Sequence, residues 1–405
     1  MGIKSLSKYI KQHFPDCISI VHISDYRYKK ISIDVSLYMC NFKAVYQEKW
    51  IEAFIHMLSC IRDNDVHCVF IFDTKSPVEK EKEKTKRMDT RVKLENRLFD
   101  IKNAIDEFNI TGVDRDNILF EFQERRKIKP SLFSKDKLNI KAISFAVEKS
   151  TKQLFVLEPT DYELVKKLLD ILKIPYYNAP MEAETICADL CFKKITEVVM
   201  SEDTDVLAYR ASLLTKFDYI NGTCYKIDYK KLLECMEFTD DQFLDFCIMC
   251  GTDYNKNLNL IGPAKAYNLI KKYNNIETIE KEEKLDISIL NHIAIRKLFR
   301  NYDTIDINIG FCGIPNRDDI ETFVVHNRLF DTKVCRKCMN YIPEYSTFGY
   351  TPDLCRKCHT NNDTFIESIT PMYIDKIYNC FISNIYVEEG NKDEKEDSDV
   401  NNNNI

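Results

Sequence analysis

Apolar runs and helical repeats predict that the first 75 residues fold as a strand, a helix and a second strand. Residues 31–35 and 68–73 are short runs rich in β-branched and aromatic side chains. Between them, residues 50–62 repeat apolar positions at the spacing of one helix face. This order is typical of a βαβ unit, so we expect an α/β fold with a mostly parallel central sheet flanked by helices.

Acidic residues follow three of the predicted strands. The first two runs end at Asp34 and Asp73, and a third run, 197–201, leads into Asp203 and Asp205. In open α/β sheets, ligands bind beyond the carboxyl ends of the strands, so side chains there lie together even when they are far apart in sequence. We therefore expect these four carboxylates to meet in one place.

Capping patterns predict where three later helices begin. Thr160 and Glu163 have the spacing of a capping box, which predicts a helix there. Another helix is expected to begin at Pro180, since proline favours the first helical turn. Thr239 and Gln242 form a second capping box, and the helix that they open leads toward Asp253.

The rest of the chain differs in character. Residues 79–108 read as a highly charged helix, whereas residues 110–157 show no clear pattern. Paired cysteines begin after about residue 331, and polar low complexity begins after about residue 361. We expect the chain beyond residue 387 to be largely disordered.

The composition is that of a globular protein. The chain has 405 residues, of which 44% are hydrophobic and 30% charged, enough for one large domain with an appendage or for two domains. There is no run of about 18 apolar residues, and the start lacks the hydrophobic segment of a signal peptide. We expect a protein that is neither secreted nor bound to a membrane.

Two cysteine pairs near the C-terminus have the spacing of a zinc ribbon. Two residues separate Cys335 from Cys338 and Cys355 from Cys358, and 16 residues lie between the pairs. Sixteen cysteines in a chain without a secretory signal indicate reduced thiols. We expect the four thiolates to hold one structural Zn²⁺. The module is either a structural staple or a second contact for nucleic acid or protein.

Six short segments occur together in one order. They are Met1-Gly2-Ile3, Asp34, Asp73, the sequence APMEAE at 179–184, SEDTD at 201–205 and GTDY at 251–254. Together they resemble the XPG/flap endonuclease family of structure-specific 5′ nucleases over about residues 1–310. The resemblance implies a PIN/5′-nuclease-like fold with a helical arch and a helix-hairpin-helix element that holds DNA.

The resemblance also implies two divalent cations, Mg²⁺ with Mn²⁺ able to substitute. The implied ligands are Asp34, Asp73, Glu182, Glu184, Asp203, Asp205 and Asp253. Mg²⁺ prefers carboxylate and water oxygens, and two such ions activate water and relieve charge on the leaving oxygen of a phosphodiester. Because Glu182 and Glu184 would point to opposite sides of a helix, we expect only some of the seven to bind directly. Without metal, their pKa values should be raised.

Charge is compatible with a phosphate-binding surface. The net charge is −6, but residues 388–399 carry seven acids and two lysines, so the rest of the chain is near −1. If seven further carboxylates hold cations, the remaining surface is positive by about six charges.

Basic residues of the charged helix match catalytic positions of the family. Lys80 and Arg87 lie seven and fourteen residues after Asp73, where the family has a lysine and an arginine facing the scissile phosphate. They would neutralise charge that develops on the phosphate, and Lys84 on the same face would add a DNA contact. The alternative is a solvated helix, although the like-charge pair of Lys80 and Lys84 disfavours a helix selected for stability alone.

Residues 259–266 resemble the helical hairpin with which the family holds duplex DNA. Backbone amides at such a turn and at the following helix N-terminus bind phosphate. The family pattern has a glycine where this chain has Leu260. A plain packing element is the alternative. The DNA contacts that we expect outside the arch are Gly2, Gly262, Lys265, Lys271 and Lys272.

These observations divide the chain into six parts. We expect an N-terminal nuclease region with the arch (1–108), a variable insertion or arch continuation (109–158), an internal nuclease region with the hairpin element (159–310), a linker (311–330), the zinc ribbon (331–360) and a tail (361–405).

The resemblance implies a Mg²⁺-dependent 5′ endonuclease that acts on flapped or branched DNA in replication, repair or recombination. A 5′→3′ exonuclease or a four-way junction nuclease of the same family stays open, as does action on RNA. A non-catalytic DNA-binding scaffold is a further alternative; it predicts lost carboxylates, and none of the seven is missing.

Partners and location are expectations of the same kind. The tail has no sliding-clamp motif, and we expect a monomer that works in the nucleus, with the cytoplasm as the alternative. Only nine glycines, among many Asn, Lys and Ile, indicate an A+T-rich coding source. A large DNA virus, acting in the nucleus of its host, or a similarly biased organism would fit.

Overall fold

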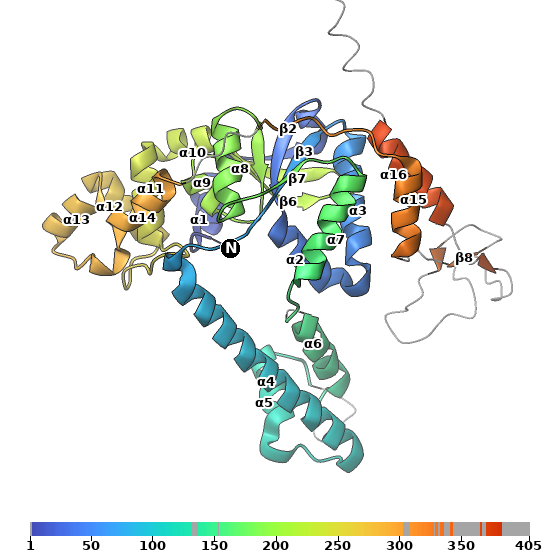
Figure 1. Ribbon diagram of the computed structural model, residues 1–405. Coiled ribbons are helices and arrows are strands. Elements are labelled where there is room, and N and C mark those ends of the chain that lie inside the picture. The colour runs from blue at the N-terminus through green and yellow to red at the C-terminus, as the bar shows by residue number, and fades with distance from the viewer. Residues whose placement is uncertain are drawn as a thin grey trace, which may run out of the picture.

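The computed structural model describes most of the chain. The described residues are 2–130, 137–152, 154–302, 308–327, 329–330, 333–335, 341–342, 365–366 and 370–382. Within them, a seven-stranded sheet lies between two groups of helices, and a helical arm extends away from this body (Figure 1). No helix in these ranges is long and apolar enough to cross a membrane.

The central sheet is mostly parallel, as the sequence predicts. Its strands are β1 (Ile18–His22), β2 (Lys30–Asp34), β3 (His67–Phe72), β4 (Tyr176–Asn178), β5 (Val198–Met200), β6 (Leu213–Asp218) and β7 (Thr223–Ile227). Their order is β1-β7-β6-β5-β2-β3-β4, and only β7 runs antiparallel to its neighbours. The three strands expected from the sequence are β2, β3 and β5. They are adjacent, so their carboxyl ends open on the same edge.

Helices bury both faces of this sheet. In β3, Val69 and Ile71 point into one core, whereas Cys68, Phe70 and Phe72 point into the other, which explains the continuous apolar run of this strand. The first core is covered by α1 (Leu6–His13), α8 (Ala183–Phe192), α9 (Asp205–Ala208) and α10 (Tyr229–Met236). The second core is covered by α2 (Val35–Tyr46), α3 (Trp50–Asp63) and α7 (Pro159–Ile171).

Capping decides where two of the predicted helices begin. α11 (Asp240–Cys250) opens with the predicted box, because Thr239 caps it and Gln242 bonds back. The helix expected at Thr160 is present, but the predicted capping box of Thr160 and Glu163 is wrong. Instead, α7 starts at Pro159, with the backbone N–H of Glu158 bonded to Asp161 at 2.7 Å. Proline fits the first helical position, since it lacks a backbone N–H and an N–H there would have no intrahelical partner.

The helix expected from Pro180 begins three residues later. Glu182 has an extended backbone and is the N-cap of α8. The carboxylate of Asp73 accepts a hydrogen bond of 2.7 Å from the backbone N–H of Ala183, the first residue of α8. This contact joins the helix N-terminus to the end of β3, and it determines where α8 starts.

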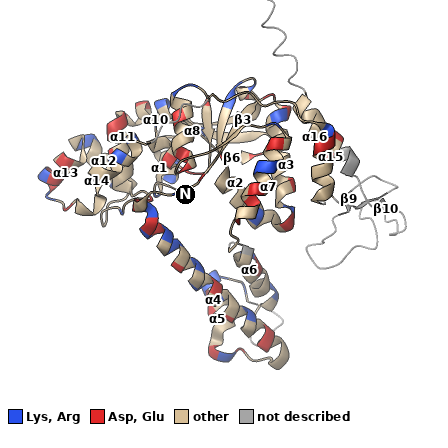
Figure 2. Cartoon of the chain, in the orientation of Figure 1, with Lys and Arg blue, Asp and Glu red and all other residues tan. Residues whose placement is uncertain are grey.

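Three helices build the arm. They are α4 (Glu81–Thr111), α5 (Ile118–Arg126) and α6 (Ile140–Lys152), so the region 109–158, unreadable in the sequence, continues the arm. Leu98 and Ile101 of α4 pack against Leu119, Phe122 and Ile143 in a small core of their own. Acidic and basic residues are interspersed along α4 (Figure 2).

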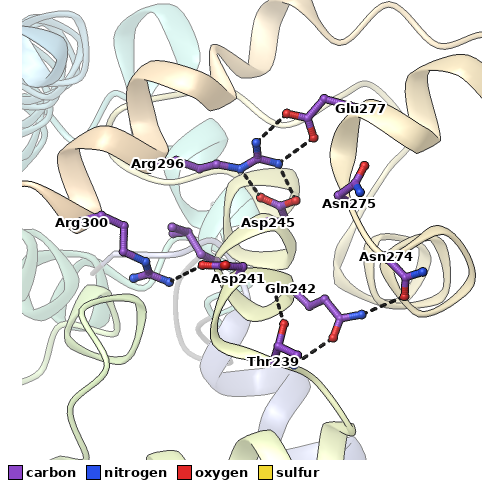
Figure 3. A pocket seen from close by; sticks show the side chains of 10 residues that line it. Thr239, Asp241, Gln242, Asp245, Asn274, Asn275, Glu277, Arg296 and Arg300 are labelled. Atoms are coloured by element: carbon purple, nitrogen blue, oxygen red, sulfur yellow. Dashed lines mark hydrogen bonds and ion pairs between the residues drawn. The ribbon is translucent and has the colours of Figure 1, made fainter.

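A second helical group lies at one end of the body, beside the point where the arm leaves it (Figure 1). It consists of α11, α12 (Pro263–Tyr273), α13 (Ile276–Glu283) and α14 (His292–Arg300). Arg296 of α14 makes two hydrogen bonds of 2.6 Å to Asp245 of α11 and bonds of 2.5 and 2.9 Å to Glu277 of α13 (Figure 3). These residues line an open cavity of about 640 Å³. The arginine thus ties three helices together, and α11 leads directly to Asp253.

We predict that Arg296→Met destabilises the protein by about 3–5 kcal/mol, the usual effect of removing one partner of a buried ion pair. Asp245 is buried and would lose its counter-charge. Urea unfolding measures the loss. Lys297→Met, at the exposed neighbouring position, is the control and should leave the midpoint nearly unchanged. Equal urea midpoints for the two variants would contradict the role of Arg296 in linking the three helices.

The C-terminal region differs from the expected linker and tail. Residues 311–330 contain α15 (Arg317–His326), and the predicted tail contains α16 (Thr370–Ile382). Phe323, Ile377 and Phe381 are buried in the core that also holds α3. Apolar residues at helical spacing therefore fold this region back onto the body.

The predicted zinc ribbon is described only in part. β8 (Lys333–Cys335), β9 (Tyr341–Ile342) and β10 (Phe365–Ile366) form a three-stranded sheet. Cys338, Cys355 and Cys358 lie outside the described residues, as does the chain after residue 382, and the side chain of Cys335 is not described. The zinc site stays a prediction.

Candidate active site

Three strand ends place four carboxylates on one edge of the sheet. Asp34 is the last residue of β2, and Ser201, directly after β5, donates to its Oδ2 at 2.9 Å. Asp203 Oδ1 accepts a hydrogen bond of 2.9 Å from the backbone N–H of Asp205. Asp73 follows β3 and is more exposed than the other three. The charges of Asp73 and Asp203 both act on Asp34, so the expected convergence is present.

Two glutamates and a further aspartate join this group from other elements. Glu182 and Glu184 lie at the N-terminus of α8, and both are buried. Because Glu182 precedes the helix, the expectation that the two side chains point to opposite sides does not apply. Glu184 interacts electrostatically with Asp34 and Asp73, and Asp205 with Asp253 from the loop after α11. The structure thus brings all seven predicted acids into one group.

Two basic residues at the base of the arm contact these acids. Lys80 Nζ lies 2.5 Å from Glu182 Oε1 and 3.5 Å from Asp253 Oδ2. Arg87 donates to Asp253 Oδ2 at 2.8 Å. Burial disfavours the charged form of Lys80, but the carboxylates of Glu184 and Glu182 outweigh burial and raise its pKa. Both cations therefore remain charged beside the carboxylates.

Burial and mutual repulsion raise the pKa values of four of the acids. Burial first, and then the charge of Asp73, raise the pKa of Asp34 to about 8. Burial, followed by neighbouring carboxylates, raises the pKa values of Glu184 and Asp205 well above the usual range. Burial also raises the pKa of Asp203. Ionising these clustered carboxylates without a bound cation is therefore unfavourable.

Three buried oxygens of the group have no hydrogen-bond partner. They are Asp34 Oδ1, Glu184 Oε2 and Asp205 Oδ1. Unpaired buried carboxylate oxygens are unfavourable, and hard divalent cations prefer this kind of donor, so the residues fit the expected ions. Among the described residues, no three Asp, Glu, His or Cys side chains are arranged with the geometry of a metal site. Other oxygens of the group bond to Lys80, Arg87 and backbone N–H groups instead.

We predict that the protein without divalent cations loses stability as the pH rises from about 4 to about 8. Asp34 holds its proton up to a pKa of about 8 in the fold, against 3.8 when unfolded. The folded state binds more protons at Asp34 in this window, so the contribution of Asp34 to stability is fully present below the window and falls through it. One proton corresponds to a slope of at most about 1.4 kcal/mol per pH unit.

Urea unfolding in chelator, measured between these pH values, tests this. Asp34→Asn removes the titrating group, so its stability should decline less steeply than that of the unchanged protein. Parallel slopes for the two proteins would contradict the assignment.

Gly2 packs directly against two of the acids. Its φ is +80°, and a Cβ at this position would come within 2.0 Å of Asp203 Oδ1 and 2.7 Å of Asp205 Oδ1. Only glycine satisfies both the backbone conformation and the space. The start of the chain is therefore part of the site, while a DNA contact at Gly2 stays a prediction.

Comparison with known proteins assigns the family. Residues 1–94 match the XPG N-terminal domain, and residues 173–253 match the XPG I-region. A probable RAD2-like endonuclease of Invertebrate iridescent virus 6 is 32% identical over 351 residues, which cover 79% of this chain and 82% of the relative. The chain belongs to the XPG/flap endonuclease family. The seven acids, Lys80 and Arg87 all fall within the two matched regions of this family.

Further relatives agree. Flap endonuclease 1 of Micromonas commoda is 30% identical over 363 residues, covering 83% of this chain and 84% of the relative. Among solved structures, the DNA-bound catalytic core of Rad2 has a TM-score of 0.57 at 16% identity, covering 80% of this chain and 95% of that chain. Flap endonuclease-1 from Methanococcus jannaschii has a TM-score of 0.54 at 19% identity, covering 90% and 96%. At these identities the structures establish the shared XPG nuclease fold.

The lysines predicted to contact DNA, three near the hairpin and Lys84 on the arm, fall into two groups. Lys265 of α12 and Lys84 of the arm are exposed. Lys271 instead pairs with Glu237, and Lys272 lies 3.6 Å from Glu283. Lys271 and Lys272 are exposed as well, but their contacts with DNA would have to compete with these acids, so Lys265 and Lys84 are the stronger candidates for phosphate contacts.

The turn before α12 departs from the XPG family pattern. Leu260 has a φ of +60° and is 87% exposed. This left-handed conformation is usually taken by glycine and costs other residues about 1–2 kcal/mol. Gly262, two residues later, is the N-cap of α12 with an extended backbone. The chain therefore keeps a left-handed turn here without the family's glycine. Whether the element acts as a DNA-binding hairpin stays a prediction.

Two tyrosines of the site escaped the sequence analysis. The hydroxyl of Tyr254 donates to Glu182 Oε2, and the hydroxyl of Tyr209 lies 3.3 Å from that of Tyr254. Tyr254 directly follows Asp253 in the matched segment 251–254, and this adjacency was the available signal. Nothing in the sequence marks Tyr209, because only the fold brings it to Tyr254.

Proposed function

We propose that this protein is a structure-specific 5′ endonuclease that hydrolyses phosphodiester bonds in flapped or branched DNA, with two divalent cations at the seven-carboxylate site. The observation that carries the proposal is the set of three unpaired, buried carboxylate oxygens beside two cationic side chains. A group kept only for stability would pair those oxygens, because leaving them unpaired weakens the fold.

The acidic residues are suited to hold the cations. The proposed ligands are Asp34, Asp73, Glu182, Glu184, Asp203, Asp205 and Asp253, some through water. Bound Mg²⁺, or Mn²⁺ in its place, would polarise a water and relieve charge on the leaving oxygen. The chain itself orients the acids, through Ser201 on Asp34 and Tyr254 on Glu182. These hydrogen bonds hold each carboxylate in one orientation.

Lys80 and Arg87 supply positive charge where the phosphate becomes more negative. Lys80 is held between Glu182 and Asp253, so its ammonium needs little reorganisation during the reaction. Arg87 is 40% exposed, and the guanidinium can donate to a phosphate with the N–H groups not used by Asp253. Before DNA binds, both side chains neutralise the acids that they contact.

Flap, nicked and four-way junction DNA of related sequence, incubated with the purified protein, test the proposal. We expect 5′-flap cleavage with Mg²⁺ or Mn²⁺, none with EDTA, and weaker cleavage of a matched RNA flap. Preferred cutting of the four-way junction, or stepwise removal of 5′ nucleotides, would select the alternatives within the family. DNA binding without cleavage under any metal condition would refute the nuclease.

The zinc and nuclear assignments rest on sequence alone. We propose one structural Zn²⁺ at Cys335, Cys338, Cys355 and Cys358, and work on DNA in the nucleus as a monomer. Metal analysis of the purified protein should give one zinc per chain, and Cys355→Ser with Cys358→Ser should remove it.

A further inference from the structure

A small, mostly apolar cavity lies beside Glu182. Its volume is about 240 Å³, and the rings of Tyr209, Tyr254 and Tyr302 line it together with Leu298. Tyr209 and Tyr302 meet edge to face, with ring centroids 5.3 Å apart and planes at 87°. Pockets for drug-sized ligands have volumes of about 300–1,000 Å³. This cavity is therefore the right size for a single flat ring system.

The polar groups of the cavity favour a nucleobase over a phosphate. They are the carboxylate of Glu182, the side-chain amide of Asn301, the hydroxyl of Thr185 and the tyrosine hydroxyls. The two Glu182 oxygens already accept one hydrogen bond each, from Lys80 and Tyr254, so a further donor would use their remaining lone pairs. A carboxylate repels phosphate but accepts hydrogen bonds from ring or amino N–H groups, and an amide both donates and accepts. Nucleobases carry such donors and acceptors on their edges, and their faces stack on aromatic side chains.

The cavity lies between the base of the arm and the metal edge. Pro77, just before the turn that leads into α4, lines one side, and Met181, just before α8, lines another. In Figure 1, α4 leaves the body beside the helical group that includes α14. Leu298 belongs to α14. A DNA strand that runs from the base of the arm to the carboxylates would pass close to Pro77 and Met181, which line this cavity.

Because the carboxylates are buried, a nucleotide that reaches them would need a place to bind its base. Asp34 and Asp205 are each only 2% exposed, so a phosphate within a stacked duplex cannot approach them closely. A nucleotide that reaches them must leave the stack, which costs a few kcal/mol in general. Stacking on an aromatic side chain returns about 1–3 kcal/mol per base.

We propose that this cavity binds the base of one nucleotide next to the scissile phosphate, stacked on the tyrosine rings and donating an N–H group to Glu182. The inference rests on the proposed nuclease function and adds a base-binding subsite to it. The bound base would hold its own phosphate at the carboxylates, so the subsite would contribute to the cleavage rate.

Filling the cavity tests this subsite. Leu298→Trp places a ring in the cavity, and Ile293→Trp, on the same helix at a position that is 71% exposed, is the matched control. Flap substrates carry an abasic site at each of three nucleotides on either side of the cut. At one position, the unchanged protein and the control should lose about 10–100-fold in kcat/KM, which corresponds to the stacking of one base.

Leu298→Trp should cleave the intact flap more slowly and lose little more at that abasic position, because the base no longer enters the cavity. Equal abasic penalties for Leu298→Trp and the control, or no penalty in any protein, would overturn the subsite. A complete lack of flap cleavage in the unchanged protein would instead refute the proposed function.

A fluorescent base gives a reading independent of cleavage and of the tryptophan variant. With 2-aminopurine scanned through the same six positions and EDTA present, binding of the unchanged protein should change the fluorescence at one position. Tyr302→Leu should reduce this change. Fluorescence equal to that of free DNA at every position would overturn the proposal.

Discussion

Replacing Asp205 with asparagine is expected to slow flap cleavage by about a hundred- to a thousand-fold, the usual loss when one preorganised electrostatic group is removed from an active site. The same change should stabilise the metal-free protein. Asp205 is buried, its Oδ1 has no partner, and burial together with Asp203 and Asp253 raises its pKa well above the usual range. Asparagine keeps the shape and removes the charge. Single-turnover cleavage and urea unfolding in EDTA measure the two effects.

Asp189→Asn is the matched control for this pair of measurements. Asp189, in α8, is also a buried acid, and one of its oxygens, Oδ2, makes no hydrogen bond. The ammonium of Lys193 lies 2.7 Å from this oxygen and supplies a counter-charge. Replacing Asp189 should lower stability and leave cleavage per folded molecule unchanged. Opposite signs for stability and activity at Asp205 indicate a residue kept for function. A destabilised Asp205→Asn variant with normal cleavage would make this acid structural.

Replacing Lys80 with methionine should also reduce the single-turnover rate by about a hundred-fold or more, since a preorganised cation would be missing at the phosphate. Lys80 is only 8% exposed and lies between Glu182 and Asp253, so its removal leaves both acids without this counter-charge. The variant should therefore be less stable in EDTA as well. Lys80→Arg should restore part of the rate, because the charge is kept in a different geometry.

Lys84→Met separates this role from general DNA binding. Lys84 lies one turn further along the arm and is exposed. Its replacement should weaken DNA binding and reduce the salt dependence of affinity by about one charge, with little change in the single-turnover rate. If Lys80→Met changed affinity but not the rate, Lys80 would be a binding residue only.

The strands and the acids that follow them could be predicted from the sequence, because each depends on residues that are neighbours along the chain. β2, β3 and β5 are short apolar runs, and parallel strands connected by helices place their carboxyl ends on one edge. The order of residues alone was therefore enough to place Asp34, Asp73 and Asp203 together. The capping box at Thr239 was equally readable, since it involves only residues close in sequence.

Several features were not readable because they depend on contacts between distant segments. The start of α8 follows from Asp73, more than a hundred residues earlier, which accepts a hydrogen bond from Ala183. α15 and α16 looked like linker and tail, because their helical signal becomes clear only when Phe323 and Phe381 are buried in a core with α3. The predicted linker was wrong for this reason.

The sequence by itself determined the parallel sheet, the family and the set of acids, because each is encoded in residue type and in order along the chain. Only the tertiary structure decided which carboxylate oxygens stay unpaired, that Tyr254 holds Glu182, and that Tyr302 and Leu298 enclose a cavity beside it. Pairing and enclosure depend on distances between atoms from separate elements. Those distances exist only after the whole core has packed.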